Sequence, residues 1–262
     1  MSFAADWLAL REPADRAARD GALARRAARA AGSDPLIVDL GCGTGATWRA
    51  LTPLLPAHAR WRFVDRDPEL LARAAAAAGD AAEVIEADIA DIAALPLAGA
   101  TLVTASAMLD LVSEAWLEAL ARRLELPFYA ALSYCGTMRW SPDDPRDAAV
   151  TAFFNRHQRG DKGFGLALGP DAAARAAVIL ADAGFAVQHA ESPWRLGPDR
   201  VVLQRELTDG IAAAAAEAGV GEAAAWGRHR RARAERSVCE IGHIDMLAIP
   251  RAMTDASGRA GR

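Results

Sequence analysis

The sequence feature that most constrains the fold is a short apolar run that ends in closely spaced glycines. Residues 36–40 read Leu-Ile-Val-Asp-Leu, and residues 41–45 read Gly-Cys-Gly-Thr-Gly. The apolar run is typical of a buried parallel strand, and the glycines allow the backbone to turn sharply and to approach a ligand closely. A helix is expected at residues 45–55, so its free N–H groups face the same turn. The segment therefore predicts a strand–turn–helix unit that binds a ligand.

Strands and helices continue to alternate after this unit. Further strands are expected at residues 61–65, 82–87, 100–105 and 127–133, with helices at residues 68–78 and 113–124. This alternation predicts a doubly wound, mostly parallel sheet. Two more strands are expected at residues 185–191 and 200–205, and the connection between them is too short for a crossover helix, so the last strand should be antiparallel. The predicted fold class is α/β, with a seven-stranded Rossmann-like sheet.

The pattern also divides the chain into three parts. Residues 1–34 are expected to form a helical segment, residues 35–205 the sheet-bearing domain, and residues 206–262 a helical C-terminal extension. Within the domain, residues 134–170 form an insertion after the fifth strand that is long for a simple connection. Insertions of this kind often bind or cover ligands, so a substrate lid is expected there. A short apolar piece at residues 241–250 is expected to cover a sheet edge or to close over the pocket.

Composition narrows the class of protein and its surroundings. The chain has 262 residues and a net charge of −4, which argues against general affinity for nucleic acid. No apolar run is long enough to span a membrane, and the N-terminus lacks the pattern of a signal peptide. Three scattered cysteines give neither a disulfide framework nor a zinc site. We therefore expect a cytoplasmic protein without a metal; the sequence leaves its oligomeric state open.

The glycine pattern by itself fits two nucleotide ligands. Gly41, Gly43 and Ala46 satisfy the fingerprint of dinucleotide-binding domains, and Asp65 follows at the distance where such domains bind a ribose. Three other features favour S-adenosylmethionine over NAD(P). Asp39 lies inside the strand, within reach of a cationic amino group; Asp88 follows the third strand; and an antiparallel pair is expected to close the sheet.

On these motifs, the chain resembles the class I S-adenosylmethionine-dependent methyltransferases over residues 35–205. The resemblance rests on the run DLGCGTG at residues 39–45 and on the acids after the next two strands. It implies S-adenosyl-L-methionine as cofactor, bound by Asp39, Gly41, Cys42, Gly43, Asp65, Arg66, Asp88, Ile89 and Ser106.

The same resemblance implies a role for each of these residues. Asp39, Gly41 and Gly43 would line the methionine end of the cofactor, with Cys42 contributing backbone. Asp65 would accept hydrogen bonds from the ribose hydroxyls, and Arg66 would border the adenine. Asp88 and the N–H of Ile89 would bind the adenine edge, and Ser106 would lie where the methionine moiety meets the substrate.

Several of these residues also have a purely structural interpretation. Asp65 would then be a loop residue whose carboxylate is hydrogen-bonded to water. Asp88 would cap a helix, and Asp91 would be the alternative residue to bind the adenine. Ser106 would be a turn residue.

The sequence gives weaker evidence for the residues that would bind and activate the methyl acceptor. Asp110 is a candidate general base, or else an ordinary surface acid or helix cap. His157 is a second candidate base. Tyr134, Asn155 and Lys162, the only lysine, are candidate substrate-binding residues in the insertion.

The predicted function is methyl transfer from S-adenosylmethionine to a small molecule. The alternatives are an NAD(P)-dependent oxidoreductase and a non-catalytic cofactor-binding protein. An RNA methyltransferase is less favoured, although the basic cluster at residues 228–236 would suit phosphates.

Overall fold

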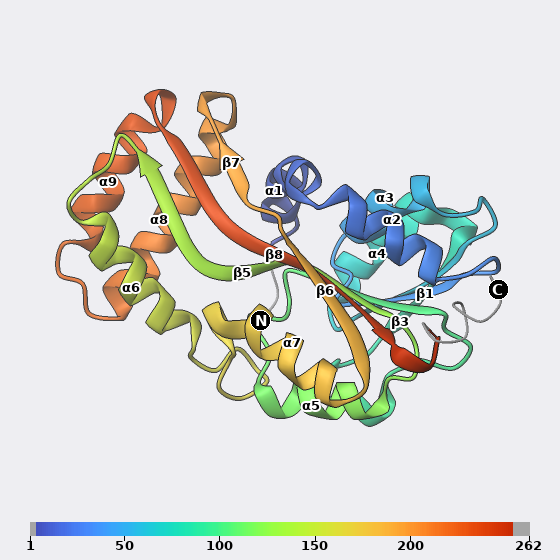
Figure 1. Ribbon diagram of the computed structural model, residues 1–262. Helices are drawn as coiled ribbons and strands as arrows, with labels where there is room; N and C mark the ends of the chain where they lie inside the picture. The colour runs from blue at the N-terminus through green and yellow to red at the C-terminus, as the bar shows by residue number, and fades with distance from the viewer. Residues whose placement is uncertain (1–3, 254–262) are drawn as a thin grey trace.

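The structure, a computed structural model, describes residues 4–253 (Figure 1). Within this range one sheet of eight strands runs through the molecule in the order β3-β2-β1-β4-β5-β8-β6, and β7 pairs with β8. The strands are β1 (Leu36–Leu40), β2 (Arg60–Asp65), β3 (Ala82–Glu86), β4 (Leu102–Ser106), β5 (Phe128–Ser141), β6 (Phe185–Glu191), β7 (Trp194–Leu196) and β8 (Val238–Pro250). Neighbouring strands are parallel except in the pairs that involve β8, which runs against all the others.

Helices cover both faces of the sheet. They are α1 (Ala5–Ala18), α2 (Gly21–Ala30), α3 (Ala46–Leu51), α4 (Pro68–Ala78), α5 (Glu114–Arg123), α6 (Asp147–Gln158), α7 (Ala172–Asp182), α8 (Val201–Glu217) and α9 (Ala223–Arg233). Figure 1 shows α2, α3 and α4 on one side of the parallel strands and α5 and α7 on the other. A separate apolar core fills each side, around Trp61 and Phe63 on the first and around Leu117 and Leu180 on the second. This two-sided covering is what an all-apolar parallel sheet requires.

The strands β5 and β8 extend beyond the parallel part of the sheet. Their antiparallel pairing continues to Ser141 and Val238, and Figure 1 shows the ribbon reaching out between α6, α8 and α9. A third core lies there, where the rings of Trp140 and Trp226 meet edge to face at 5.1 Å. The molecule therefore has a second lobe built on the far end of the same two strands.

The α/β class and the antiparallel closing strand are confirmed, but the identity of that strand differs from the prediction. Residues 200–205 do not form a strand, because Val201 begins α8. The short β-branched run resembles a strand when read alone, yet Leu203 and Ile211 are buried on one helix face. The closing strand is β8, which the sequence placed in a helical extension. The sheet consequently has eight strands instead of seven within the described residues.

The predicted boundaries between the three parts of the chain, and those of the insertion, do not all coincide with the ends of helices and strands. Residue 205 lies inside α8, and residues 134–170 begin as the outer half of β5 before they form α6. The apolar piece at residues 241–250 lies inside β8, between β5 and β6. No helix between residues 4 and 253 combines the length and apolar character needed to cross a membrane.

Candidate functional site

The turn between β1 and α3 is built on three glycines with left-handed backbone angles. Gly41, Gly43 and Gly45 have φ of 64°, 54° and 84°, a region that side chains with a Cβ rarely adopt. The N–H groups of Gly41 and Cys42 donate to the carbonyl of Val64, at 2.8 and 3.1 Å, and so fix the turn against β2. The glycines are therefore required by the shape of the turn.

The same glycines keep a space open above the turn. A Cβ added at Gly41 would lie 3.4 Å from Sδ of Met108, and one added at Gly43 would lie 3.2 Å from a methyl carbon of Leu8. Because the second distance is tighter than an ordinary contact, a side chain at Gly43 would force Leu8 to move. The turn thus forms a cradle that fits a ligand approaching the backbone closely.

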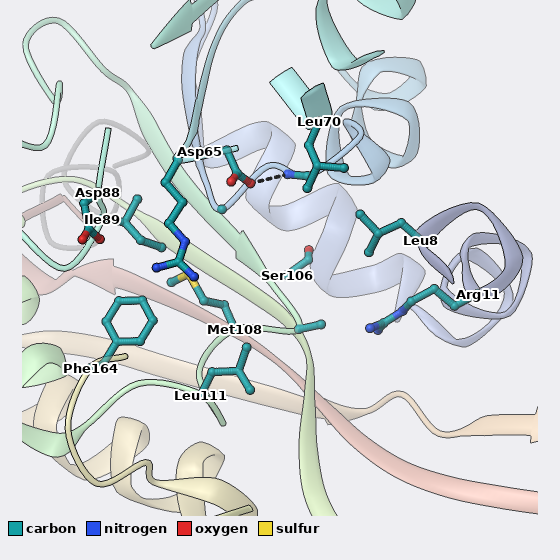
Figure 2. Close-up of a pocket in the computed structure, with 14 residues that line it drawn as sticks. Leu8, Arg11, Asp65, Leu70, Asp88, Ile89, Ser106, Met108, Leu111 and Phe164 are labelled. Atoms are coloured by element: carbon teal, nitrogen blue, oxygen red, sulfur yellow. Dashed lines mark hydrogen bonds between the residues drawn. The ribbon is translucent and has the colours of Figure 1, made fainter. Parts of the chain in front are cut away.

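This cradle is part of a cavity at the carboxyl ends of the parallel strands. Ligands of open α/β sheets bind at this edge. The cavity is lined by Leu8, Arg11, Gly41, Gly43, Asp65, Arg66, Leu70, Asp88, Ile89, Ser106, Ala107, Met108, Leu111 and Phe164. Figure 2 shows Asp88, Ile89 and Phe164 on the opposite side from Leu8 and Arg11.

Asp65 connects the end of β2 to the glycine turn. Its Oδ2 accepts the N–H of Gly43 at 2.9 Å, and its Oδ1 accepts the N–H of Asp67 at 3.1 Å. Each carboxylate oxygen keeps a further lone pair, and the side chain lines the cavity. The arrangement is suited to hold a pair of neighbouring hydroxyl groups.

Asp39 and Cys42 lie near the turn but do not line the cavity. Asp39 is fully buried; its Oδ1 accepts the hydroxyl of Thr104 at 2.7 Å, whereas its Oδ2 has no partner. Burial raises the pKa of Asp39 to about 7, against the opposing effects of the Thr104 hydroxyl and the Arg19 charge. Burial also raises the pKa of the Cys42 thiol. The Oδ2 of Asp39 is therefore a buried acceptor, close to the turn, that is unpaired among the described residues.

Ser106, at the end of β4, belongs to a hydrogen-bond network that reaches the N-terminal helices. Its hydroxyl accepts from Thr47 at 3.0 Å and from the guanidinium of Arg19 at 3.1 Å. Arg19 lies between α1 and α2, and its guanidinium also lies over the ring of Tyr129. The network holds the first two helices against the floor of the cavity.

Asp88, Ile89 and Arg66 form the far wall. Asp88 accepts the N–H of Ala90 at 2.9 Å and is exposed, so one oxygen remains available to the cavity. The carbonyl of Ile89 accepts the indole N–H of Trp116 at 2.8 Å, which fixes that loop. Asp91 does not line the cavity, and it caps the short helix of Ile92–Ala94.

A second cavity, of about 570 Å³, adjoins the first. Arg11, Ala107 and Leu111 line both. Its remaining lining residues are Trp7, Asp110, Leu132, Tyr134, Met138, Phe154, His157, Gln158, Lys162, Trp194, Glu206, Leu207, Gly210, Ile211, Ala214, Ile241 and His243.

Of the residues expected on the acceptor side, Asp110, Tyr134, His157 and Lys162 line this second cavity. Asn155 does not line it. The amide oxygen of Asn155 instead accepts the hydroxyl of Tyr134 at 2.7 Å, so Asn155 holds the ring in place.

Asp110 and His157 differ in their surroundings. Burial raises the pKa of Asp110 to about 6, although the N–H of Tyr134 and the charges of Arg11 and Lys162 oppose the shift. His157 pairs through Nε2 with the carboxylate of Glu217 at 3.1 Å, and its buried Nδ1 has no partner. Asp110 is half-buried and lines the cavity without a direct ion pair in the described residues.

Sequence reasoning missed the contribution of α1 and of β8. Trp7, Leu8 and Arg11 come from a segment to which the sequence gave no site, and His243 lies on the strand that was not recognised. Arg11 and Asp15 lie one helical turn apart and form a hydrogen bond of 2.9 Å. In the sequence, this spacing indicates a helix but not a binding site. Nothing local indicated which cavity α1 would cover.

The backbone between the two cavities is strained. Ala107 and Leu132 have φ of 51° and 58°, although neither is glycine, and both line the second cavity. Such conformations persist where the surrounding structure holds them, and they cluster at binding and catalytic sites. The N–H of Leu132 donates to the buried carboxylate of Asp245 at 2.8 Å, and that of Ala107 donates to Ala131.

Comparison with known proteins agrees with this geometry. Residues 37–125 match a family model described as a methyltransferase domain. The chain is similar to the YcgJ protein from Bacillus subtilis, with 14% identity, a TM-score of 0.54, and coverage of 87% of this chain and 97% of that chain. It is also similar to the geranyl diphosphate C-methyltransferase from Streptomyces coelicolor, with 13% identity, a TM-score of 0.46, and coverage of 87% and 79%. No curated protein sequence matches the chain.

Residues 37–125 are thus similar to a methyltransferase domain, and the sheet order agrees with the fold of the YcgJ protein.

Proposed function

We propose that the protein methylates a small molecule held in the second cavity. The observation that carries the proposal is the wall common to the two cavities, formed by Arg11, Ala107 and Leu111. Methyl transfer is a displacement in which the enzyme must chiefly bring donor and acceptor together. Two adjoining cavities, one of them at the glycine cradle, meet that requirement.

The residues of the first cavity fit S-adenosylmethionine by their chemistry. Asp65 would hold the ribose hydroxyls, and Asp88 and Ile89 the adenine edge. The cradle at Gly41 and Gly43 would receive the methionine moiety, whose cationic amino group suits the orphaned oxygen of Asp39. When bound, this cofactor supplies a methyl group on a positively charged sulfur.

Asp110 is proposed as the proton acceptor. The bound cofactor would supply the methyl group, and the Asp110 carboxylate would accept the proton that the acceptor atom loses. The pKa of about 6 leaves Asp110 largely ionised at neutral pH and makes it a stronger base than an ordinary aspartate. His157 is proposed to contact the substrate from the cavity wall.

The structure gives less support to the alternatives. The antiparallel strand β8 between β5 and β6 is the feature expected of methyltransferases and not of dinucleotide domains. The basic cluster is partly engaged within the chain, since Arg230 is buried against Asp147 and Arg231 pairs with Asp209. A non-catalytic role does not explain a second cavity with the half-buried carboxylate of Asp110 beside the first.

Calorimetric titration with S-adenosylhomocysteine and with NAD tests the cofactor site. We expect binding of the former only. Asp88→Ala should weaken it about tenfold, the effect of one hydrogen bond to a charged group. Asp91→Ala is the matched control, because Asp91 caps a nearby turn without lining the cavity. Equal losses in both variants, or preference for NAD, would contradict the assignment.

Transfer of a labelled methyl group tests the acceptor class. The protein is incubated with labelled S-adenosylmethionine and either the low-molecular-weight fraction of a cell extract or bulk tRNA. Label should enter a small organic product. Incorporation into tRNA alone would overturn the proposal.

A further inference from the structure

His243 is a buried polar residue of the second cavity that the proposed reaction does not use. It lies on β8 opposite Tyr134 and is 6% exposed. Its ring is fixed between two others, with centroids 6.3 Å from Tyr134 and 5.0 Å from Trp194. Its Nδ1 is buried and has no hydrogen-bond partner among the described residues. Since buried polar atoms are nearly always paired, an unpaired imidazole that lines the cavity points to a ligand.

The imidazole of His243 is uncharged at neutral pH. Burial, reinforced by the charge of Arg11, lowers its pKa to about 3, against the opposing effect of the Ile241 backbone. A neutral imidazole forms hydrogen bonds with hydroxyl and carbonyl groups but offers no charge to a carboxylate. The partner of His243 is therefore expected to be an uncharged oxygen group.

The walls of the cavity favour a flat, apolar molecule. Trp7, Tyr134, Phe154 and Trp194 present aromatic surface to it. Two of these rings are held by their polar ends, because the Trp194 N–H donates to Asp15 at 2.9 Å and the Tyr134 hydroxyl is bonded to Asn155. Rigid aromatic walls pack best against a planar ring system.

The charges around the cavity compensate one another. Arg11 is paired with Asp15. Lys162 is close enough to lower the pKa of Asp110, so these two charges also oppose each other. Glu206, the remaining acid of the lining, is exposed to solvent. A charged acceptor would find no uncompensated partner deep in the cavity.

We infer that the acceptor is an uncharged, hydroxylated aromatic compound with a second oxygen, and that the imidazole of His243 binds this second oxygen. The inference rests on the proposed function. The hydroxyl that faces Asp110 is the one methylated: its oxygen forms the bond to the methyl carbon, its proton passes to the Asp110 carboxylate, and the thioether leaves with the electron pair of the broken bond. His243 acts as a specificity-determining residue.

Binding of naphthol and of the isomeric naphthalenediols tests this inference. Titrations are made in the presence of S-adenosylhomocysteine, with wild type and with His243→Phe, which keeps a flat ring but removes both nitrogens. In wild type, at least one naphthalenediol should bind about fivefold to tenfold more tightly than naphthol, the effect of one hydrogen bond. In His243→Phe this preference should disappear, whereas His189→Phe, on the exposed face of β6, should keep it.

Thermal unfolding of the ligand-free variants separates a binding role from a structural one. His243→Phe should unfold at the same or a higher temperature than wild type, because an unpartnered buried nitrogen is removed. A large loss of stability would show that His243 supports the fold, and would overturn the inference. So would an equal preference in wild type and His243→Phe, or no binding of any naphthol by wild type. If S-adenosylhomocysteine itself fails to bind wild type, the proposed function fails as well.

Discussion

Among single residues, burial decides the chemistry of two carboxyl groups. Asp39 and Asp110 have an ordinary pKa of 3.8 when exposed, and burial raises it to about 7 and about 6. Because both folded values lie above the unfolded one, each group favours the folded state most below about pH 3.8, and this contribution is lost as the pH rises through 6 and 7. The ligand-free protein thus holds these two carboxylates at some cost in stability, which is common for groups that serve a site.

The rate of methyl transfer should follow the ionisation of Asp110. With saturating cofactor, the rate should rise about tenfold per pH unit up to about pH 6 and then level, since only the ionised carboxylate accepts a proton. Asp110→Asn should lower the plateau about a hundredfold and flatten the profile. Initial rates between about pH 5 and 8 provide the measurement, with Asp91→Ala as the control that keeps the profile. An unchanged profile in Asp110→Asn would assign the base elsewhere.

Within single elements, the backbone conformation determines which side chains face the cavities. The pairing of β5 with β8 shifts register between Ala130 and Ser133, where Leu132 takes its left-handed conformation. Because side chains alternate along a strand, one extra residue changes which of them face the cavity. Asp245 stabilises this bulge by accepting the N–H of Leu132 and the hydroxyl of Tyr129. The glycine turn after β1 is a second place where backbone conformation shapes a cavity.

Two alanine substitutions separate the strain of the glycine turn from its role in binding. Gly43 and Gly32 both have positive φ, but only at Gly43 would an added Cβ meet a cavity residue, Leu8; at Gly32 it meets nothing within 4 Å. Each substitution should cost about 1 kcal/mol in the free energy of unfolding. Only Gly43→Ala should also weaken binding of S-adenosylhomocysteine, by about tenfold. Urea unfolding and calorimetry give the two quantities. If Gly32→Ala weakened binding as much, backbone strain alone would explain the effect.

For the whole molecule, β8 joins the two lobes. It pairs with β5 along most of its length, with β6 at one end and with β7 at the other. It also carries His243 to the second cavity and Asp245 to the bulge of β5. A segment from the last part of the sequence is therefore needed to complete both the sheet and the candidate acceptor site.

Removal of β8 should abolish cooperative folding. A chain that ends before Val238 would leave β5 and β6 without their common neighbour and would uncover the β5 residues that pair with β8, such as Phe128, Tyr129 and Ala130, which are at most 1% exposed. We expect loss of the sharp urea transition. A chain that ends at Met253 and keeps β8 whole is the control. A cooperative transition in the shorter chain would mean that the sheet is stable without its antiparallel strand.

The sequence by itself determined the first half of the sheet and the glycine turn. Strands such as β1 and β2 are signalled by local apolar runs, and the turn between β1 and α3 is signalled by glycines that its backbone angles require. These signals are local, because periodicity and glycine placement act over a few residues. The positions of Gly41, Asp65 and Asp88 at one edge of the sheet follow from parallel pairing alone.

Tertiary structure decided everything that depends on partners distant in the sequence. Residues 200–205 look like a strand alone, yet Val201 begins α8, which buries Leu203 and Ile211 in the core of the second lobe. β8 is the closing strand because it pairs with both β5 and β6. Its register depends on these distant partners, so no local sequence pattern predicts it. The gathering of Arg11, Asp110 and His243 around one cavity likewise depends on packing between segments about a hundred residues apart, which no local pattern encodes.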